Sequence, residues 1–368
     1  MRFPEFSEEW EYKSLGEIGE SLIGLTYSPS DVVKEGGTIV FRSSNIQDGV
    51  INYGDLVRVS KKIKDSIITR DGDLLICARN GSTRLIGKNA LLKKSDEGQT
   101  FGAFMMVFRS IDNRFVHQLL STKAYSTQVS ENLGARINQI TTRNFAEYTF
   151  GMPQTSEEKE KIGTFLELIN DRIETQSKII EEQETLLKSL ADKLFLQNNH
   201  SCQLSELVNI EKGKQINADT LSETGDYYVM NGGITPSGYY SEYNVPAGAI
   251  SISEGGNSCG YVQFNEKPFW SGGHCYSLQC RTNLVDYKYI YYYLKTKEAD
   301  VMALRIGSGL PNIQKKDIEK FTISYPSLQL QKQFVKALDA LSGKINTEKN
   351  LLEKYCQQKS YLLSQMFI

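Results

Sequence analysis

Two stretches with the same heptad pattern constrain the fold of this chain more than any other feature. In residues 156–195, apolar residues recur in alternating steps of four and three, which places them on one side of a long helix. This seam consists of Ile162, Leu166, Ile169, Ile173, Gln176, Ile180, Gln183, Leu187, Leu190 and Leu194. The same spacing returns 172 residues later, at Phe334, Leu338, Leu341, Ile345, Glu348, Leu352, Tyr355, Lys359, Leu362 and Met366. At about 1.5 Å per residue, each helix is expected to be roughly 60 Å long.

The segments that precede the two helices also correspond, so nearly the whole chain is a duplication. Leu204–Leu207 corresponds to Leu15–Ile18, and residues 246–253 correspond to residues 70–78. A period of about 172 residues is far longer than the 20–50 residues of a solenoid repeat. We therefore expect an α/β (α+β) protein with two duplicated domains, residues 1–154 and 199–326, and two helical segments, residues 155–198 and 327–368.

Each domain lies between helix ends, so the two helices are expected to form an antiparallel coiled coil with a pseudo-two-fold axis across its middle. Their charges favour this pairing. Residues 156–196 contain ten acids and six bases, a net charge of −4, whereas residues 327–368 contain three acids and six bases, a net charge of +3. Exposed pairs of this kind select partners more than they add stability, at roughly 0.2–1 kcal/mol each.

Within the first domain the pattern predicts several local elements. Residues 38–42 and 101–108 read as strands, and Asp48-Gly49 predicts a hairpin turn. Thr155 or Ser156 is expected to cap the first long helix.

Composition is that of a globular protein, with 40% hydrophobic and 23% charged residues. No apolar run approaches the ~18 residues of a membrane span, and the six cysteines show no metal-site spacing, so a cytoplasmic, reduced protein is expected. His274, Cys275 and Cys280 lie close together but without a fourth ligand, and are interpreted as strand residues. Asp71 and Asp73 are expected to form a turn and not a metal pair.

The sequence contains no nucleophile elbow, P-loop, zinc pattern, dinucleotide fingerprint or adenine-methylation motif. The double glycines at 232–233 and 255–256 lack a following helical pattern. We therefore expect a binding protein with no catalytic residue, no metal site and no cofactor of its own.

The net charge of −2 is unlike that of a free-standing nucleic-acid binder. The charge is uneven, however, because residues 58–94 contain ten basic and three acidic residues, a local charge of +7. This stretch favours contact with phosphates.

In this order, and twice over, these features resemble the specificity subunit of type I restriction–modification systems along nearly the full chain. The resemblance is carried by Arg42–Gly49, Gly72–Leu75, Gly307–Ile313, and two proline-preceded helices that end in Phe195 and Phe367. The first half departs from it, with Ala135 and Asn138 where the second half has Ser308 and Pro311.

The resemblance implies two target-recognition domains that bind a bipartite, asymmetric double-stranded DNA target, with a helix-set spacer between half-sites. It implies a non-catalytic subunit that recruits two DNA adenine methyltransferase (modification) subunits and restriction/translocase subunits. The partners, not this chain, would bind S-adenosylmethionine, ATP and magnesium.

Arginine can pair with guanine, asparagine or glutamine with adenine, and lysine with phosphates. Polar loops beside glycine supply the candidates for DNA contact. In the first half they are Arg42, Ser43, Asn45, Arg79, Asn80, Ser82, Thr83, Arg84 and Lys88. In the second half they are Lys212, Lys214, Asn231, Ser253, Glu254, Asn257, His274, Arg305, Asn312 and Lys315.

Other interpretations of these residues are open. Arg305 and Asn312 could cap a local helix or hold the second domain to the long helices. The tyrosines of the second half could stack on flipped bases or pack in strands and helices. A coiled-coil scaffold that joins proteins without reading DNA is the main alternative for the chain, and a DNA enzyme with an unrecognised active site is the second.

Overall fold

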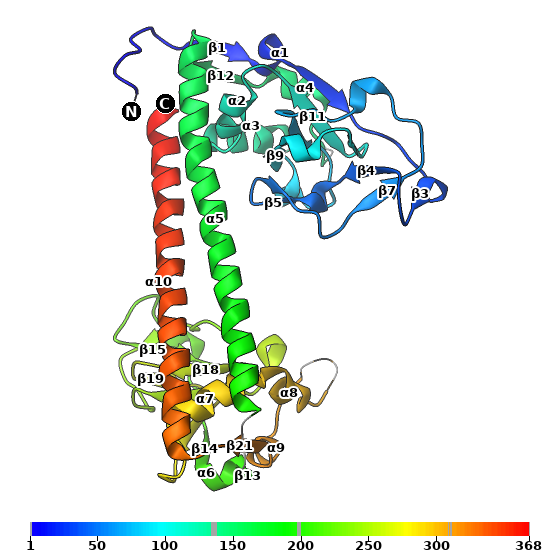
Figure 1. Ribbon diagram of the computed structural model, residues 1–368. Helices are drawn as coiled ribbons and strands as arrows, with labels where there is room; N and C mark the ends of the chain where they lie inside the picture. Colours follow the sequence, from blue (N-terminus) through cyan, green and yellow to red (C-terminus); the bar gives the residue numbers. More distant parts are fainter. Residues whose placement is uncertain (1, 134–137, 197–199, 308, 310, 368) are drawn as a thin grey trace. The chain divides into compact units, whose positions relative to one another are not determined.

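The computed structural model describes residues 2–133, 138–196, 200–307, 309 and 311–367, and it divides into two compact units (Figure 1). Unit 1 comprises Met1–Gln176 and Leu351–Ile368, and unit 2 comprises Ser177–Asn350. Each unit contains one mixed domain and a part of each long helix, α5 (Ser156–Phe195) and α10 (Leu328–Met366). Every residue of the two predicted seams is buried or half-buried, which confirms the heptad assignment.

Unit 1 contains three sheets and a hairpin. Its main sheet is antiparallel, in the order β2-β11-β8-β9, formed by Glu20–Ile23, Met105–Arg109, Leu74–Cys77 and Asn89–Leu91. The second sheet has the order β10-β4-β7-β3, formed by Thr100–Phe101, Thr38–Phe41, Val57–Val59 and Val32–Val33. The remaining strands pair as β1 (Glu11–Ser14) with β12 (Thr149–Met152), and β5 (Ile46–Gln47) with β6 (Val50–Ile51). Its short helices are α1 (Leu15–Ile18), α2 (Asn113–Leu119), α3 (Lys123–Leu133) and α4 (Thr142–Glu147).

Unit 2 repeats this plan strand for strand in its main sheet. The order is β14-β20-β17-β18, formed by Val208–Lys212, Cys275–Cys280, Ala249–Ser253 and Val262–Asn265. A second sheet, β16-β15-β19, consists of Tyr239–Tyr240, Tyr227–Met230 and Phe269–Ser271, and β13 (His200–Gln203) pairs with β21 (Thr322–Tyr325). Its short helices are α6 (Leu204–Leu207), α7 (Tyr287–Thr296), α8 (Glu298–Ala303) and α9 (Lys315–Glu319). The second sheet of each unit contains one parallel pair, β4–β10 or β15–β19. The duplication predicted from sequence is therefore present in the topology.

The strand predicted over residues 101–108 is wrong as a single element, because the structure breaks it between β10 and β11. The break falls at Gly102, whose carbonyl oxygen would lie only 2.2 Å from a Cβ built on Gly24. Gly24 must therefore be a glycine, because any side chain there would collide with the backbone at Gly102. Gly213 and Gly272 make the same approach in unit 2, also at 2.2 Å. The chain thus passes from one sheet to the other at the same point in both repeats.

The hairpin prediction is confirmed. Gln47 pairs with Val50, and Asp48 and Gly49 have φ values of 49° and 81°, as a type I′ turn requires. Thr155 caps α5, because its hydroxyl accepts a hydrogen bond from the Glu158 amide at 3.4 Å.

The long helices run antiparallel within each unit. In unit 1, Ile162 and Leu166 near the start of α5 share a core with Leu362 and Met366 near the end of α10 (Figure 1). In unit 2 the end of α5 shares a core with the start of α10, through Ala191, Phe195, Phe334 and Leu338. The heptad seam is thus buried against the domain as well as against the other helix. The pseudo-two-fold axis and the DNA spacer remain predictions.

Polar contacts accompany this packing. The Arg172 guanidinium lies 4.8 Å from the centre of the Tyr355 ring in unit 1, and Lys349 pairs with Glu184 at 2.6 Å in unit 2. The last pair joins the basic helix to the acidic one, as the charge difference predicts.

The phenylalanine at the end of each helix fills the same place in each unit. The ring of Phe367 lies 5.3 Å from that of Phe115 on α2, and the ring of Phe195 lies 5.3 Å from that of Tyr289 on α7. Each helix end is therefore fixed to the core of a domain by aromatic contacts. Among the described residues, no helix combines the length and the apolar character that crossing a membrane requires.

Candidate nucleic-acid interface

A polar loop follows β8 in unit 1 and is held by backbone hydrogen bonds. The Ile140 amide donates to the Ala78 carbonyl at 2.8 Å, and Arg79 forms a bridge with Gln139. The Asn80 side chain accepts a hydrogen bond from the Ser82 amide at 3.0 Å and donates one to the Ser43 hydroxyl, also at 3.0 Å. Asn80 therefore joins this loop to the loop that follows β4, and brings the two groups of candidate residues of unit 1 together.

The loop after β4 is organised around Asn45, which is fully buried. Its side-chain oxygen accepts from the Arg42 amide at 2.9 Å, and its amide group donates to the carbonyls of Asn52 and Asp55 at 3.0 and 2.9 Å. Arg42 pairs with the carboxylate of Asp55 at 2.7 Å. The structure thus places Asn45 inside the loop and away from the surface, where it fixes the backbone that carries Arg42 and Ser43.

Arg79, Ser82, Thr83 and Arg84 are exposed, whereas Lys88 is half-buried. Phe104, which falls in the apolar strand expected over residues 101–108, is 60% exposed. The guanidinium carbon of Arg79 lies 5.2 Å from the centre of the Phe104 ring. The sequence analysis did not predict this exposure; Gly102, two residues earlier, is the signal from which a break in the strand could be inferred.

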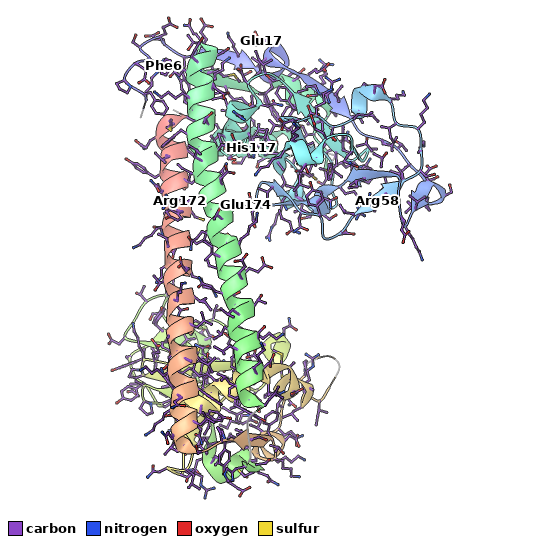
Figure 2. The ribbon with its side chains drawn as sticks, viewed as in Figure 1. Phe6, Glu17, Arg58, His117, Arg172 and Glu174 are labelled. Atoms are coloured by element: carbon purple, nitrogen blue, oxygen red, sulfur yellow. The ribbon has the colours of Figure 1, made fainter. Side chains whose placement is uncertain are left out.

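Part of the basic stretch 58–94 serves the fold. Lys61 lies 3.5 Å from the Asp31 carboxylate, and Lys93 lies 3.6 and 3.5 Å from Asp171 and Glu174 of α5. Arg58 is half-buried and lies on the side of the domain away from α5, whereas Glu174 projects from that helix (Figure 2). At Arg58, the positive charge of this stretch therefore lies away from α5.

Asp73 confirms the turn interpretation of its segment. It is 2% exposed, accepts a hydrogen bond from the Arg70 amide, and receives two from the Arg109 guanidinium at 2.8 and 2.7 Å. The Asp73 carboxylate raises the pKa of Arg109. Within the part of the chain that the structure describes, no three His, Cys, Asp or Glu side chains are grouped to hold a metal ion.

Unit 2 builds its loop on the same backbone framework. The Ile313 amide donates to the Glu254 carbonyl at 2.8 Å, and Gly255 forms a bridge with Asn312. Glu254 thus occupies the place of Ala78, one residue beyond the segment 246–253 that the sequence matched with 70–78. Its amide donates to the His274 carbonyl just as the Ala78 amide donates to the Phe104 carbonyl, so His274 occupies the place of Phe104.

The carboxylate of Glu254 collects polar groups in this loop. It is close to Lys212 at 2.5 Å, to the Tyr276 hydroxyl at 3.1 Å and to His274 Nδ1 at 3.5 Å. Burial and the Glu254 charge raise the pKa of Tyr276, so its hydroxyl stays protonated and donates to the carboxylate. Lys212 and His274 have side chains that are 52% and 61% exposed, whereas that of Glu254 is 11% exposed. A buried acid therefore holds an exposed lysine and an exposed histidine together.

The other candidates of unit 2 fall into two groups. Ser253 is buried and donates to the Gly232 carbonyl at 2.6 Å, while Asn231 accepts from the His274 amide at 3.1 Å. These two residues shape the loop. The exposed candidates are Lys214, Asn257, Arg305, Asn312 and Lys315. Residues 134–137, 308 and 310, which belong to the two corresponding loops at 133–140 and 306–313, lie outside the described residues.

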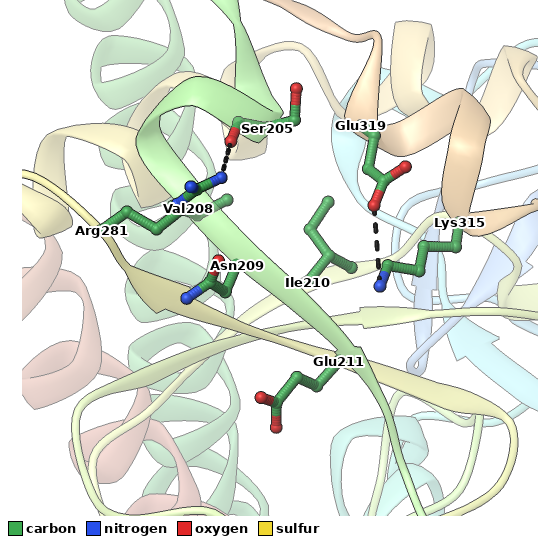
Figure 3. Close-up of a pocket in the computed structure, with 8 residues that line it drawn as sticks. All are labelled: Ser205, Val208, Asn209, Ile210, Glu211, Arg281, Lys315 and Glu319. Atoms are coloured by element: carbon green, nitrogen blue, oxygen red, sulfur yellow. Dashed lines mark hydrogen bonds and ion pairs between the residues drawn. The ribbon is translucent and has the colours of Figure 1, made fainter.

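Lys315 also lines a shallow polar hollow of about 220 Å³ beside β14 (Figure 3). Its other lining residues are Ser205, Val208, Asn209, Ile210, Glu211, Arg281 and Glu319. Arg281 donates to the Ser205 carbonyl at 2.9 Å, and Lys315 lies 3.6 Å from Glu319. Of its charged side chains, Lys315 and Glu319 thus pair with each other, while Arg281 is held by a backbone carbonyl.

Packing explains many of the tyrosines of unit 2. Tyr289, Tyr292 and Tyr293 of α7 are buried, and the Tyr292 hydroxyl donates to Asp339 of α10 at 2.7 Å. Tyr240 lies edge-on to Trp270, with ring centres 5.1 Å apart. The packing interpretation is confirmed for the α7 residues.

The loops of the two units therefore share a backbone and differ in chemistry. Lys212 pairs with Tyr276 as Ile23 pairs with Met106, so the set Lys212, Glu254 and His274 replaces Ile23, Ala78 and Phe104. In unit 1 Ile23 and Phe104 are 61% and 60% exposed. The surface of unit 1 is apolar, and the Arg79 guanidinium lies over its Phe104 ring. The surface of unit 2 has the buried Glu254 carboxylate between the exposed Lys212 and His274.

The family model and the similar proteins of known name agree on one family. The family model described as the type I restriction modification DNA specificity domain matches residues 7–185 and 198–354. A Mycoplasma pneumoniae protein named a type I specificity subunit is 33% identical over 152 residues, which cover 41% of this chain and 40% of that protein. The EcoKI type I restriction enzyme specificity subunit of Escherichia coli is 28% identical over 177 residues, which cover 45% of this chain and 38% of that subunit. The chain thus spans less than half the length of these relatives.

Solved structures share the fold. The type I restriction–modification S subunit of M. genitalium superposes with a TM-score of 0.73 at 20% identity, over 100% of this chain and 99% of that one. A chain from a structural study of the assembly and conformational transition of the type I system has a TM-score of 0.52 at 17% identity, over 98% of each chain. At these identities the likeness concerns the fold alone.

Proposed function

Because this chain belongs to the family of type I restriction modification DNA specificity domains, we propose that it is the DNA-recognition subunit of a type I restriction–modification complex. The observation that carries the proposal is the pair of polar loops, which leave β8 and β17 at the same backbone position and are fastened by the same hydrogen bonds from Ile140 and Ile313. Duplicated loops with unlike side chains suit a target of two different half-sites.

In this role the chain binds and positions but catalyses nothing. Two adenine methyltransferase subunits and restriction/translocase subunits are its proposed protein partners. S-adenosylmethionine, ATP and magnesium are proposed to bind to those partners. The net charge of −2 supports shared DNA binding, because the partners would contribute phosphate contacts that this chain lacks.

The test is sequence-specific DNA binding by the complex reconstituted with its methyltransferase subunits. The target is first identified from the methylated positions in the host genome. Arg79→Ala and Arg84→Ala should each weaken binding at constant fold, and a lost phosphate contact should lower the slope of log affinity against log salt by about 0.9. Lys188→Ala on α5 removes one exposed positive charge elsewhere and serves as the control.

A complex that binds all DNA sequences equally would contradict the proposal and favour the scaffold alternative. Methyl transfer or DNA cleavage by the purified chain alone would favour the enzyme alternative. Unchanged affinity and methylation in both arginine variants would remove the loop after β8 from the interface.

A further inference from the structure

Unit 1 exposes an aromatic ring where unit 2 exposes a histidine. Phe104 is 60% exposed, and its backbone carbonyl accepts hydrogen bonds from the amides of Ala78 and Arg79 at 3.0 and 2.9 Å. The backbone of Phe104 is therefore fixed to the first residues of the polar loop. An exposed large apolar side chain alone has no special meaning, but this one lies against the exposed Arg79.

The Arg79 side chain lies against the Phe104 ring. Its guanidinium lies 5.2 Å from the centre of the Phe104 ring, so one face of the ring is covered by a cation and the two side chains act side by side. Asn80 links the same loop to Ser43 at 3.0 Å, which restricts its movement. A rigid loop that presents arginine and phenylalanine together can contact two neighbouring groups at once.

Base edges in the major groove offer two groups that match these side chains. Guanine presents two acceptors to an arginine, and thymine presents a 5-methyl group to an apolar side chain such as phenylalanine. Successive base pairs are about 3.4 Å apart, so two side chains about 5 Å apart reach the same or the next base pair.

We propose that Phe104 contacts a thymine 5-methyl group in the half-site read by unit 1, and that Arg79 contacts a guanine in the adjacent base pair. This inference rests on the proposed DNA-recognition function. Unit 2, with Lys212, Glu254 and His274 at the corresponding positions, makes no such methyl contact. The two half-sites therefore differ in their dependence on a single methyl group.

The test changes one functional group of the DNA at a time. Each thymine of the target is replaced in turn by deoxyuridine, which lacks only the methyl group, and each guanine by 7-deazaguanine, which lacks the N7 acceptor. Binding is measured with the complex that contains the whole chain. One thymine-to-uracil change should weaken binding about fourfold, or about 0.8 kcal/mol for one buried methyl group. At the adjacent guanine, 7-deazaguanine should weaken binding about tenfold.

Protein variants assign these effects to side chains. Phe104→Ala should bind the thymine and uracil targets equally, while it keeps its sensitivity to 7-deazaguanine. Arg79→Ala should show the reverse pattern. Phe104→Leu keeps an apolar contact and should retain part of the uracil effect, and His274→Ala in unit 2 should change neither sensitivity. Circular dichroism confirms that each variant is folded.

Several results would overturn the inference. One is a target in which no thymine responds to removal of its methyl group. Another is a Phe104→Ala complex whose affinity falls by the same factor on both targets, so that its preference for thymine over uracil is unchanged. That result would indicate a ring inserted between bases. Failure of the proposed function looks different, because the unvaried complex would then show no preference for its target over unrelated DNA.

Discussion

His117 should make the stability of unit 1 depend on pH. It lies on α2 and is 8% exposed, beside the fully buried Gln118, whose side chain lies 3.3 Å from Asn170 of α5 (Figure 2). Burial lowers the pKa of His117 to about 4, and the positive charges of Lys359 and Lys93 add to the effect. The imidazole is therefore neutral in the folded protein at pH 7.

The sign and size follow from linkage. The unfolded chain has a histidine pKa near 6.5, so below that pH it binds a proton that the folded chain does not. Stability is thus fully present above pH 6.5 and is lost as the pH falls toward 4. A difference of about 2.5 pKa units corresponds to about 3.4 kcal/mol at most, of which about 2 kcal/mol should be lost between pH 7 and pH 5.

Hydrogen exchange of the α2 amides, together with urea unfolding at pH 7 and pH 5, measures this loss. The variant His117→Gln should reduce the loss between the two pH values by about 2 kcal/mol, whatever its stability at pH 7. His200→Gln, in an exposed position of β13, is the matched control and should keep the full pH dependence. An equal loss in His117→Gln and in the unvaried chain would refute the argument that burial of this imidazole is responsible.

Three further perturbations test other parts of the structure. Arg109→Met should cost unit 1 about 3–5 kcal/mol, because it leaves the buried carboxylate of Asp73 unpaired; a melting temperature within error of the unvaried chain would contradict this. Gln331→Leu should cost unit 2 about 1–3 kcal/mol, because the Gln331 side chain accepts from the Asp286 amide at 2.8 Å and is fully buried; unfolding in urea measures the loss, and no change would mean that water replaces the contact. Insertion of four residues near Gln183 should lengthen the gap between the DNA half-sites; an unchanged methylation pattern in the host genome would contradict the spacer function of the helices.

The elements that depend on periodicity and turn chemistry could be predicted from the sequence. The heptad seams, the Asp48-Gly49 turn and the cap at Thr155 are local patterns, so each follows from neighbouring residues alone. The strand expected over residues 101–108 failed because its break depends on Gly24, a residue distant in sequence whose lack of a side chain lets its backbone lie against Gly102.

Site residues were harder to place because their accessibility depends on tertiary contacts. Asn45 and Arg79 are both polar residues in glycine-containing loops, yet three hydrogen bonds bury Asn45 whereas Arg79 is exposed. Phe104 shows the opposite case, since an aromatic residue in an apolar run is ordinarily a core residue. Composition alone does not distinguish these cases.

Unit 1 consists of two segments from opposite ends of the chain, which affects when it can fold during synthesis. Its core includes Leu362 and Met366, and Phe367 packs on it, although these residues follow all of unit 2 in the chain. A ribosome therefore releases the first domain before the side chains that complete its core exist. Unit 2 is formed from the continuous segment Ser177–Asn350, so it can complete its fold earlier than unit 1. A chain interrupted in the last turns of α10 would leave the apolar surface of the first domain uncovered, so quality-control proteases should remove interrupted chains in preference to finished ones.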